Sequence, residues 1–155
     1  MNMNKAIIGG LLWMGLIGVV AADDRWLKDF EQAKRVAAER NLPILADFAG
    51  SDWCGWCIRL DKEVFSKEDF IKYARESVVL FLADFPRHKE LPEKQAKQNE
   101  DLAEHYGVQG LPTVLLLDST GKVIAETGYE PGGAAAYVEH VKALLKAKKD
   151  VEKGK

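Results

Sequence analysis

Apolar residues recur along the chain in two spacings, and these spacings predict alternating helices and strands. Over Asp24–Arg40 they stand three and four residues apart, as on one face of a helix. The run Ile44–Ala49 is apolar at nearly every position, as expected for a strand that is covered on both faces. Val78–Phe85 and Thr113–Leu117 are rich in Val, Leu and Phe and predict two further strands.

Helical spacing returns between these strands. A helix is expected to begin near Cys54 and to turn Ile58, Leu60 and Val64 toward the core. A further helix is predicted for Ser66–Glu76, where the opening serine and the aspartate three positions later resemble a capping box.

The second half of the chain continues the alternation. A helix over Gln95–Tyr106 is expected to end at Gly107, because glycine is the usual residue just past a helix. Asp118–Gly121 predicts a hairpin turn into a strand over Lys122–Thr127, and Ala134–Lys146 has the spacing of a last helix. Alternating elements followed by a hairpin indicate the α/β class, with a central mixed β-sheet flanked by helices on both faces.

The first 22 residues have the composition of a targeting segment. Lys5 supplies a positive charge, the 17 residues from Ala6 to Ala22 carry none, and small residues precede Asp23. This pattern predicts a secretory signal peptide over residues 1–22, cleaved after Ala21 or Ala22. The alternative is an uncleaved anchor, although 17 residues is near the shortest length that spans a bilayer. Either outcome places the domain outside the cytoplasm, periplasmic or secreted.

Composition and charge set the remaining bounds. The chain of 155 residues predicts one domain, over residues 23–148, followed by a charged tail at 149–155 that is expected to fray. Apolar residues make up 47% of the chain and the net charge is −2. This composition and net charge do not favour binding to nucleic acid. They also do not favour a stable association with a membrane after the signal peptide is cleaved. The fold needs no second copy, and a monomer is expected.

Candidate chemistry is concentrated in Trp53-Cys54-Gly55-Trp56-Cys57, which contains the only two cysteines of the sequence. The pair stands where a strand passes into a helix, which is the layout of a dithiol/disulfide redox centre. As a structural staple it would close a loop of four residues and contribute only about 1.9 kcal/mol, against about 3 kcal/mol for a 15-residue loop. The pattern therefore favours a redox role.

Four features in order along the chain carry a resemblance to a known family. They are a strand ending in Asp47-Phe48, the Cys-x-x-Cys motif with Trp53 before it, Leu111-Pro112-Thr113 leading into an apolar strand, and a hairpin followed by Gly128. Over Ile44–Leu145 the chain resembles the thioredoxin-like superfamily, and within it the exported proteins with a Gly-Ser-Asp-Trp-Cys lead-in. The resemblance implies a thioredoxin-like fold and a thiol–disulfide oxidoreductase.

The resemblance also implies roles for individual residues. Cys54, at a helix N-terminus that stabilises a thiolate, would be the exposed cysteine that attacks the substrate. Cys57, one turn further in and more buried, would resolve the mixed disulfide. Asp47 would aid proton transfer to Cys57, and Pro112 would form a cis peptide bond facing the pair. The alternative for Asp47 is a carboxylate that is only solvated or hydrogen-bonded at the strand end.

Residues around the pair are expected to contact the substrate, and these are Trp53, Gly55, Trp56, Leu111 and Pro112. Gly55 and Trp56 replace the Gly-Pro of thioredoxin itself, and the dipeptide between the cysteines influences the reduction potential. The alternative for Trp56 is that it only covers the start of the helix.

The expected function is that of an exported thiol–disulfide oxidoreductase, a reductase that exchanges disulfides with cysteine-containing proteins through Cys54 and Cys57. No cofactor and no metal are expected, but a redox partner must recycle the dithiol. Alternatives are a disulfide-donating oxidase, a metal-binding or metal-delivery protein that uses the two cysteines, and a non-catalytic module that reuses the fold. The charged loop Pro86–Lys94 is longer than a minimal thioredoxin needs and is expected to influence partner choice.

Overall fold

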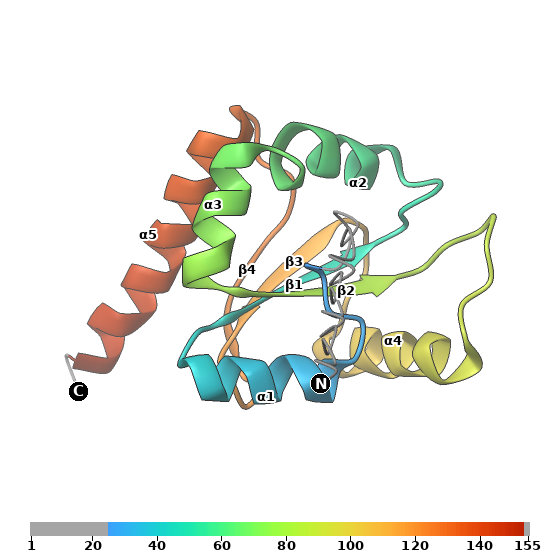
Figure 1. Ribbon diagram of the computed structural model, residues 1–155, viewed down its shortest axis with the longest axis horizontal. Helices are drawn as coiled ribbons and strands as arrows, with labels where there is room; N and C mark the ends of the chain where they lie inside the picture. Colours follow the sequence, from blue (N-terminus) through green and yellow to red (C-terminus); the bar gives the residue numbers. More distant parts are fainter. Residues whose placement is uncertain (1–24, 154–155) are drawn as a thin grey trace, which may run out of the picture.

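The computed structural model describes residues 25–153, which form a four-stranded sheet with helices on both faces (Figure 1). The strands are β1 (Ile44–Ala49), β2 (Val79–Asp84), β3 (Thr113–Leu117) and β4 (Val123–Thr127). Their order is β2-β1-β3-β4, with β1 parallel to β2 and antiparallel to β3, and β3 antiparallel to β4. The predicted α/β class with a mixed sheet is confirmed.

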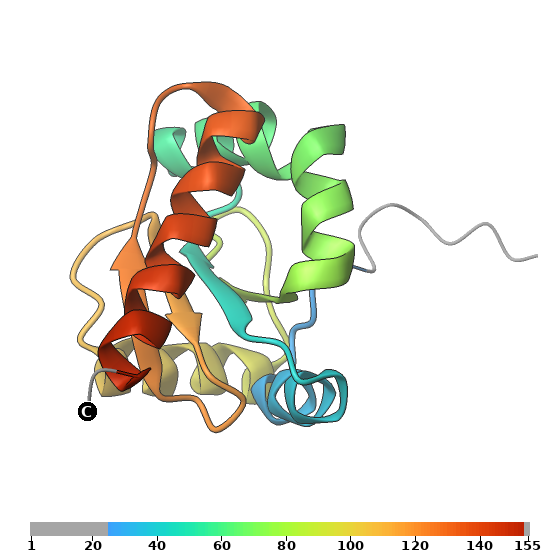
Figure 2. The ribbon, with the colours of Figure 1, turned by 90° about the vertical axis from the view of Figure 1, so that its left-hand side faces the viewer.

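The helices divide between the two faces of this sheet. They are α1 (Phe30–Arg40), α2 (Gly55–Leu60), α3 (Glu68–Ser77), α4 (Glu93–Tyr106) and α5 (Gly133–Lys153), with a π-helical turn, η1 (Asp61–Phe65), that continues α2. One face is covered by α1 and α4, and the other by α2, α3 and α5. Figure 2 shows α5 running along its face of the sheet, with α3 packed beside it.

The central strand β1 supplies side chains to both cores, and all six of its residues are buried. Ile44, Ala46 and Phe48 pack with α1 and α4, whereas Leu45 packs with α3 and α5. Because successive side chains of a strand point to opposite faces, a strand with two covered faces is apolar at nearly every position, as the sequence predicted. Asp47 falls on the Leu45 face and is therefore buried beneath the second group of helices.

The N-terminal helix is shorter than predicted. Asp29 caps α1, and its Oδ1 accepts a hydrogen bond from the Gln32 N–H at 2.8 Å. The helix therefore begins at Phe30, and the described residues before it, 25–29, are not helical. Leu27 instead forms an isolated parallel bridge with Phe81 at the edge of β2.

The segment after the cysteines departs from the prediction at two points. Leu60 and Val64 are buried as expected, but Ile58 is 45% exposed. The buried face of α2 and η1 follows the spacing Cys57, Leu60, Val64, which turns Ile58 to the outside. Ser66 does not cap α3, because its hydroxyl donates to a carbonyl of the preceding turn.

The C-terminal half follows the prediction closely. Gly107 ends α4 in the left-handed conformation, with a φ of 67°, and β3 has its predicted bounds. The last helix does not end at Lys146 but continues to Lys153, so the tail that was expected to fray is helical over its described part. Residues 147–153 are mostly Ala, Lys and Glu, which are strong helix formers, and this accounts for the extension.

Two further observations concern membrane spans and the N-terminal segment. No helix within residues 25–153 combines the length and the apolar character needed to cross a bilayer. The predicted signal peptide lies outside the described residues.

Candidate active site

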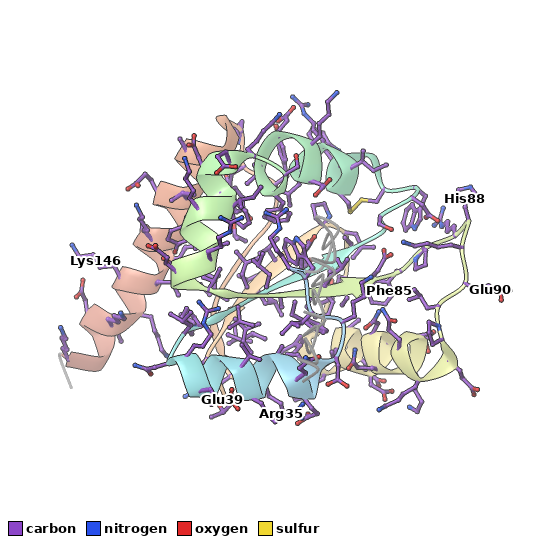
Figure 3. All side chains as sticks on the ribbon, in the orientation of Figure 1. Arg35, Glu39, Phe85, His88, Glu90 and Lys146 are labelled. Atoms are coloured by element: carbon purple, nitrogen blue, oxygen red, sulfur yellow. A yellow bond between two sulfur atoms is a disulfide. The ribbon has the colours of Figure 1, made fainter. Side chains whose placement is uncertain are left out.

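Cys54 and Cys57 form a disulfide at the start of α2, visible as the yellow bond in Figure 3. Cys54 is the N-cap of the helix and Cys57 lies in its first turn, with their Cα atoms 5.2 Å apart. The exposed fractions are 7% and 5%, so the predicted contrast between an exposed and a buried cysteine is wrong for the disulfide form. The reason is that the pair forms a small apolar cluster with Ala49, and Trp53, Leu82 and Leu111 pack against that cluster.

Two backbone amides donate to the sulfur atoms. The Cys57 N–H points to Cys54 Sγ at 3.2 Å, and the Gly50 N–H points to Cys57 Sγ at 3.5 Å. The Cys54 sulfur thus occupies the N-cap position, where unpaired amides and the helix dipole favour negative charge. After reduction the same amides stabilise a thiolate, which is the reactive form of cysteine.

Trp53 is fixed between the disulfide and the loop that follows β2. Its Nε1–H donates to the Phe85 carbonyl at 2.7 Å, and the guanidinium of Arg87 lies 3.5 Å from the ring centroid. Glycine is required at position 50, because a Cβ there would lie 2.5 Å from Trp53 Cε2. The indole packs against the disulfide and covers one side of it.

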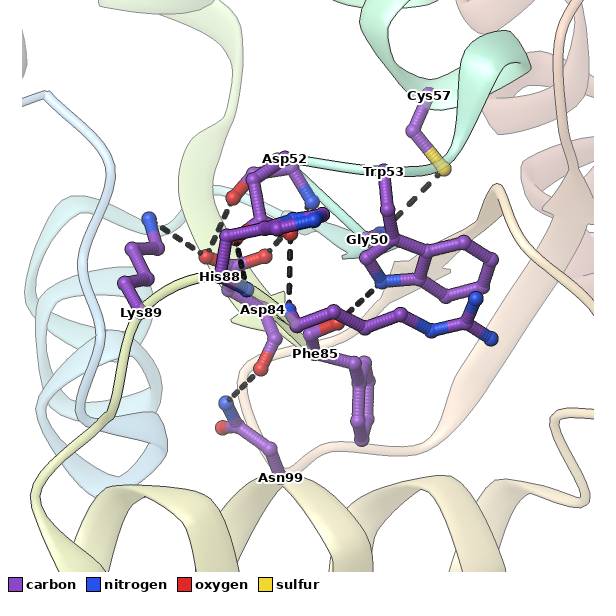
Figure 4. A network of polar contacts seen from close by, with 11 residues as sticks. Gly50, Asp52, Trp53, Cys57, Asp84, Phe85, His88, Lys89 and Asn99 are labelled. Atoms are coloured by element: carbon purple, nitrogen blue, oxygen red, sulfur yellow. Dashed lines mark hydrogen bonds and ion pairs between the residues drawn. The ribbon is translucent and has the colours of Figure 1, made fainter.

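Asp52, just before the motif, holds the first part of that loop (Figure 4). Its two carboxylate oxygens accept hydrogen bonds from the backbone N–H groups of Arg87 and His88, at 2.9 and 2.8 Å. The bond from the Arg87 N–H is the main reason that the pKa of the Asp52 carboxyl lies below its usual value. The carboxylate therefore persists into acidic solution and keeps the loop attached to the cysteine motif.

Asp84, at the end of β2, forms a second connection between the same segments. Its buried carboxylate accepts from the Ser51 N–H at 3.0 Å and from the Ser51 hydroxyl at 2.7 Å, and it pairs with Lys89 at 3.0 Å. The Asp84 carbonyl accepts from Asn99 Nδ2 at 2.9 Å (Figure 4). Sequence reasoning missed this residue, although it is an acidic residue within an apolar strand, as Asp47 is.

Trp56 lies on the surface beside the pair and is 55% exposed. Its ring centroid is 5.1 Å from that of Tyr129, and the Arg59 guanidinium lies 5.4 and 5.3 Å from these two rings. Glu63 completes the cluster by accepting from Arg59 Nε at 2.7 Å and from the Tyr129 hydroxyl at 2.6 Å. The bond from Tyr129 is the main reason that the pKa of Glu63 is lowered. Trp56 is therefore held in one place while its ring stays accessible.

The peptide bond between Leu111 and Pro112 is cis, as predicted. Leu111 packs against the disulfide, which places this bond beside the pair. Gly128, just after β4, approaches closely, because a Cβ on it would lie 3.3 Å from the Pro112 carbonyl oxygen. The segment after β4 and the segment before β3 therefore meet next to the cysteines.

Asp47 is buried on the face of β1 that also carries Ala49, the residue in contact with the disulfide. Burial raises the pKa of its carboxyl to about 8, and the nearby charges of Asp61 and Asp84 act in the same direction. Within the described part of the chain, Asp47 Oδ1 has no hydrogen-bond partner. The carboxyl is thus not the solvated strand-end group of the alternative interpretation, and it holds a proton at neutral pH.

The histidines lie apart from one another. His88 is on the loop after β2, His105 lies against Tyr106, and His140 Nε2 is 2.8 Å from the Thr127 hydroxyl. Over residues 25–153, no group of three or more His, Cys, Asp or Glu side chains is placed to hold a metal ion.

Comparison with known proteins relates this geometry to a family. A family model for the thioredoxin-like domain matches residues 30–142. The disulfide bond reductase DsbH of Chlamydia pneumoniae is 36% identical over 128 residues, which cover 83% of this chain and 76% of that protein. The thioredoxin-related protein DsbJ of the same organism is 29% identical over 155 aligned positions, which cover 92% of this chain but only 44% of DsbJ.

The fold is shared as well. A solved structure of a DsbH oxidoreductase superposes with a TM-score of 0.76 at 34% sequence identity, over 89% of this chain and 95% of that chain. The family match spans most of the described residues and includes the cysteine pair and the cis-proline. The chain therefore belongs to the thioredoxin-like family, and it is a thiol–disulfide oxidoreductase.

Proposed function

We propose that this chain reduces disulfides in cysteine-containing proteins outside the cytoplasm, with Cys54 as the attacking cysteine and Cys57 as the resolving one. The observation that carries the proposal is the placement of the pair in the first turn of α2, beside the cis Leu111–Pro112 bond. The reductive direction is supported by the name of the relative DsbH, a disulfide bond reductase.

Reduction of a substrate proceeds through two exchanges. The Cys54 thiolate attacks one sulfur of the substrate disulfide, that bond breaks, and the other substrate sulfur leaves as a thiolate that takes up a proton. Cys57 then loses its proton and attacks Cys54 Sγ, which releases the second substrate thiolate and forms the Cys54–Cys57 disulfide. Two electrons pass to the substrate, and a dithiol partner returns them to the enzyme.

Asp47 takes part in the second exchange, in which its ionised form, a minor fraction at neutral pH, accepts the Cys57 proton. Three observations support this role: the carboxyl lies on the disulfide face of β1, its Oδ1 is unpaired among the described residues, and its pKa is about 8. A group with that pKa gains and loses a proton readily near neutral pH. The second exchange should therefore become faster as the pH rises through 8.

The substrate segment lies across the surface next to the pair, in contact with Trp53, Gly55, Trp56, Leu111 and Pro112. Gly55 is exposed, and the space where its side chain would stand is open. The carbonyl and amide groups near a cis-proline are free to pair with an extended chain. This surface accepts a protein segment without a deep pocket, which suits a protein substrate.

Export, oligomeric state and recycling complete the proposal. The uncharged N-terminal segment from Ala6 to Ala22 supports secretion by a cleaved signal peptide. A monomer suffices for this chemistry, because one chain supplies the cysteine pair, Trp53 and the cis Leu111–Pro112 bond. No bound cofactor takes part, since the electrons reside in the cysteine pair and in the dithiol partner.

Trapping of mixed disulfides tests the two cysteine roles. Cys57→Ser should accumulate covalent complexes with protein partners through Cys54, seen on non-reducing gels and identified by mass spectrometry. Cys54→Ser is the matched control, because it keeps one thiol but lacks the attacking one, and it should trap none. Equal trapping by both variants would contradict the assignment of roles.

The equilibrium reduction potential of the Cys54/Cys57 couple tests the direction. A value near that of thioredoxin, about −270 mV, supports a reductase. A value of about −120 mV would instead support the disulfide-donating oxidase. Absence of any reversible couple would overturn both.

A further inference from the structure

The loop after β2 presents three consecutive basic residues, Arg87, His88 and Lys89, and all three are exposed. The loop is fastened to the cysteine motif, because Asp52 accepts from the amides of Arg87 and His88. Figure 3 shows His88 at the end of the molecule that carries the disulfide. The basic side chains are therefore held near the position where a substrate must approach.

Among these three residues, Arg87 differs in its partners. Lys89 is paired with Asp84 at 3.0 Å. The Nδ1 atom of His88 lies 3.7 Å from a carboxylate oxygen of Asp52. The Arg87 guanidinium lies over the Trp53 ring, and no carboxylate within residues 25–153 forms an ion pair with it. Arg87 thus offers a positive charge that the described chain does not neutralise.

The arginine of α2, Arg59, has a different set of partners. Arg59 also lies over aromatic rings, those of Trp56 and Tyr129, but Glu63 is bonded to its Nε at 2.7 Å. Of these two guanidinium groups, that of Arg87 is therefore the one without a carboxylate partner among the described residues. A bound segment could meet the accessible ring of Trp56 and the available guanidinium of Arg87.

We propose that Arg87 is a specificity residue that selects substrates with an Asp or Glu beside the reactive disulfide. A guanidinium that stacks by its face keeps its N–H groups at the edge, where a carboxylate can accept two of them. Contact with Trp53 also restricts the side chain before binding, so less freedom is lost in the complex. This inference rests on the proposed function and names the substrate class of the same site.

Three disulfide-bonded peptides that differ only in the two positions beside one cysteine, carrying Glu, Gln or Lys, test the proposal. With dithiothreitol as the recycling reductant, the wild type should reduce the Glu peptide with a kcat/KM about three- to tenfold above that of the Gln peptide, and the Lys peptide should be slowest. Arg87→Gln should bring the Glu/Gln ratio close to one and change kcat/KM for the Gln peptide by less than about twofold. Added salt should shrink the wild-type ratio.

Two further variants separate recognition from other effects. Arg87→Lys keeps the positive charge but lacks the planar guanidinium, which can donate two N–H groups to one carboxylate. This variant should retain only part of the preference for the Glu peptide over the Gln peptide. Arg35→Gln makes the same change of net charge on the outer side of α1, away from the disulfide (Figure 3), and should leave the ratio unchanged.

The possible failures are distinguishable. Equal loss of activity on all three peptides in Arg87→Gln would mean that Arg87 only supports Trp53, and would overturn the proposal. A wild-type ratio near one would overturn it as well. If the wild type reduced none of the peptides, the proposed function itself would fail, and this inference with it.

Discussion

Asp47 makes the stability of the domain depend on pH. In the folded protein burial raises the pKa of its carboxyl to about 8, from an ordinary value of 3.8. Between these values the folded state binds a proton that the unfolded chain has lost, so the free energy of unfolding falls as the pH rises, by up to about 1.4 kcal/mol per pH unit. The stability that the protonated Asp47 carboxyl contributes is fully present below pH 3.8 and is lost above about pH 8.

Asp47→Asn should remove this slope, because the amide cannot ionise. Urea unfolding at pH values of about 5, 7 and 9 should show a variant that is more stable than the wild type at the highest pH. Asp69→Asn, which changes an exposed carboxyl of α3, is the control and should keep the wild-type slope. An unchanged slope in Asp47→Asn would show that another group carries the pH dependence.

Single positions show what the sequence pattern could predict. Cys54 and Cys57 were identifiable because a motif of fixed spacing stands at a strand-to-helix junction, and the cis form of Pro112 followed from the family resemblance. Ile58 was misplaced because one residue's difference in spacing turns a helical side chain by about 100°. Apolar character alone does not say which neighbouring position faces the core.

Among the elements, the loop between β2 and α4 depends most on one side chain, Asp52. Asp52→Ala should free the amides of Arg87 and His88, which donate to that carboxylate. Their hydrogen exchange, followed by NMR or mass spectrometry, should accelerate by about five- to tenfold.

Asp118 provides a matched control, since its Oδ1 likewise accepts from two backbone amides, those of Thr120 and Lys122. Asp118→Ala should accelerate exchange at those two amides and leave Arg87 and His88 unchanged. If Asp52→Ala left the exchange of Arg87 and His88 at the wild-type rate, the loop would be held by Asp84 and Trp53 instead.

The predicted elements differ in accuracy for physical reasons. β1 was placed correctly because a strand buried on both faces gives a continuous apolar run. α1 was placed too early because Trp26 and Leu27 continue its spacing, although the Asp29 cap fixes the start. The contacts of Asp52 with the loop and of Asp84 with Ser51 join residues more than 30 positions apart, and no local pattern reports such pairings.

On the scale of the whole molecule, the domain should stay folded when the disulfide is reduced. The bond closes a loop of only four residues, worth about 1.9 kcal/mol, and neither of the two large cores contains a cysteine. Thermal unfolding with and without dithiothreitol should show one cooperative transition in each case, with midpoints less than about 10 °C apart. The Cys54→Ser, Cys57→Ser double variant should resemble the reduced protein. Loss of the transition on reduction would assign the disulfide a structural role.

The bridge at Leu27 determines whether another extended chain can pair with the β2 edge of the sheet. β2 is an edge strand, and an open edge invites any extended chain to add to the sheet and aggregate with it. Leu27 occupies this edge: its N–H donates to the Leu80 carbonyl at 2.9 Å, and its carbonyl accepts from the Leu82 N–H at 2.9 Å. The middle of this sheet edge is therefore already paired within the chain, so an extended segment of another protein cannot add to it there.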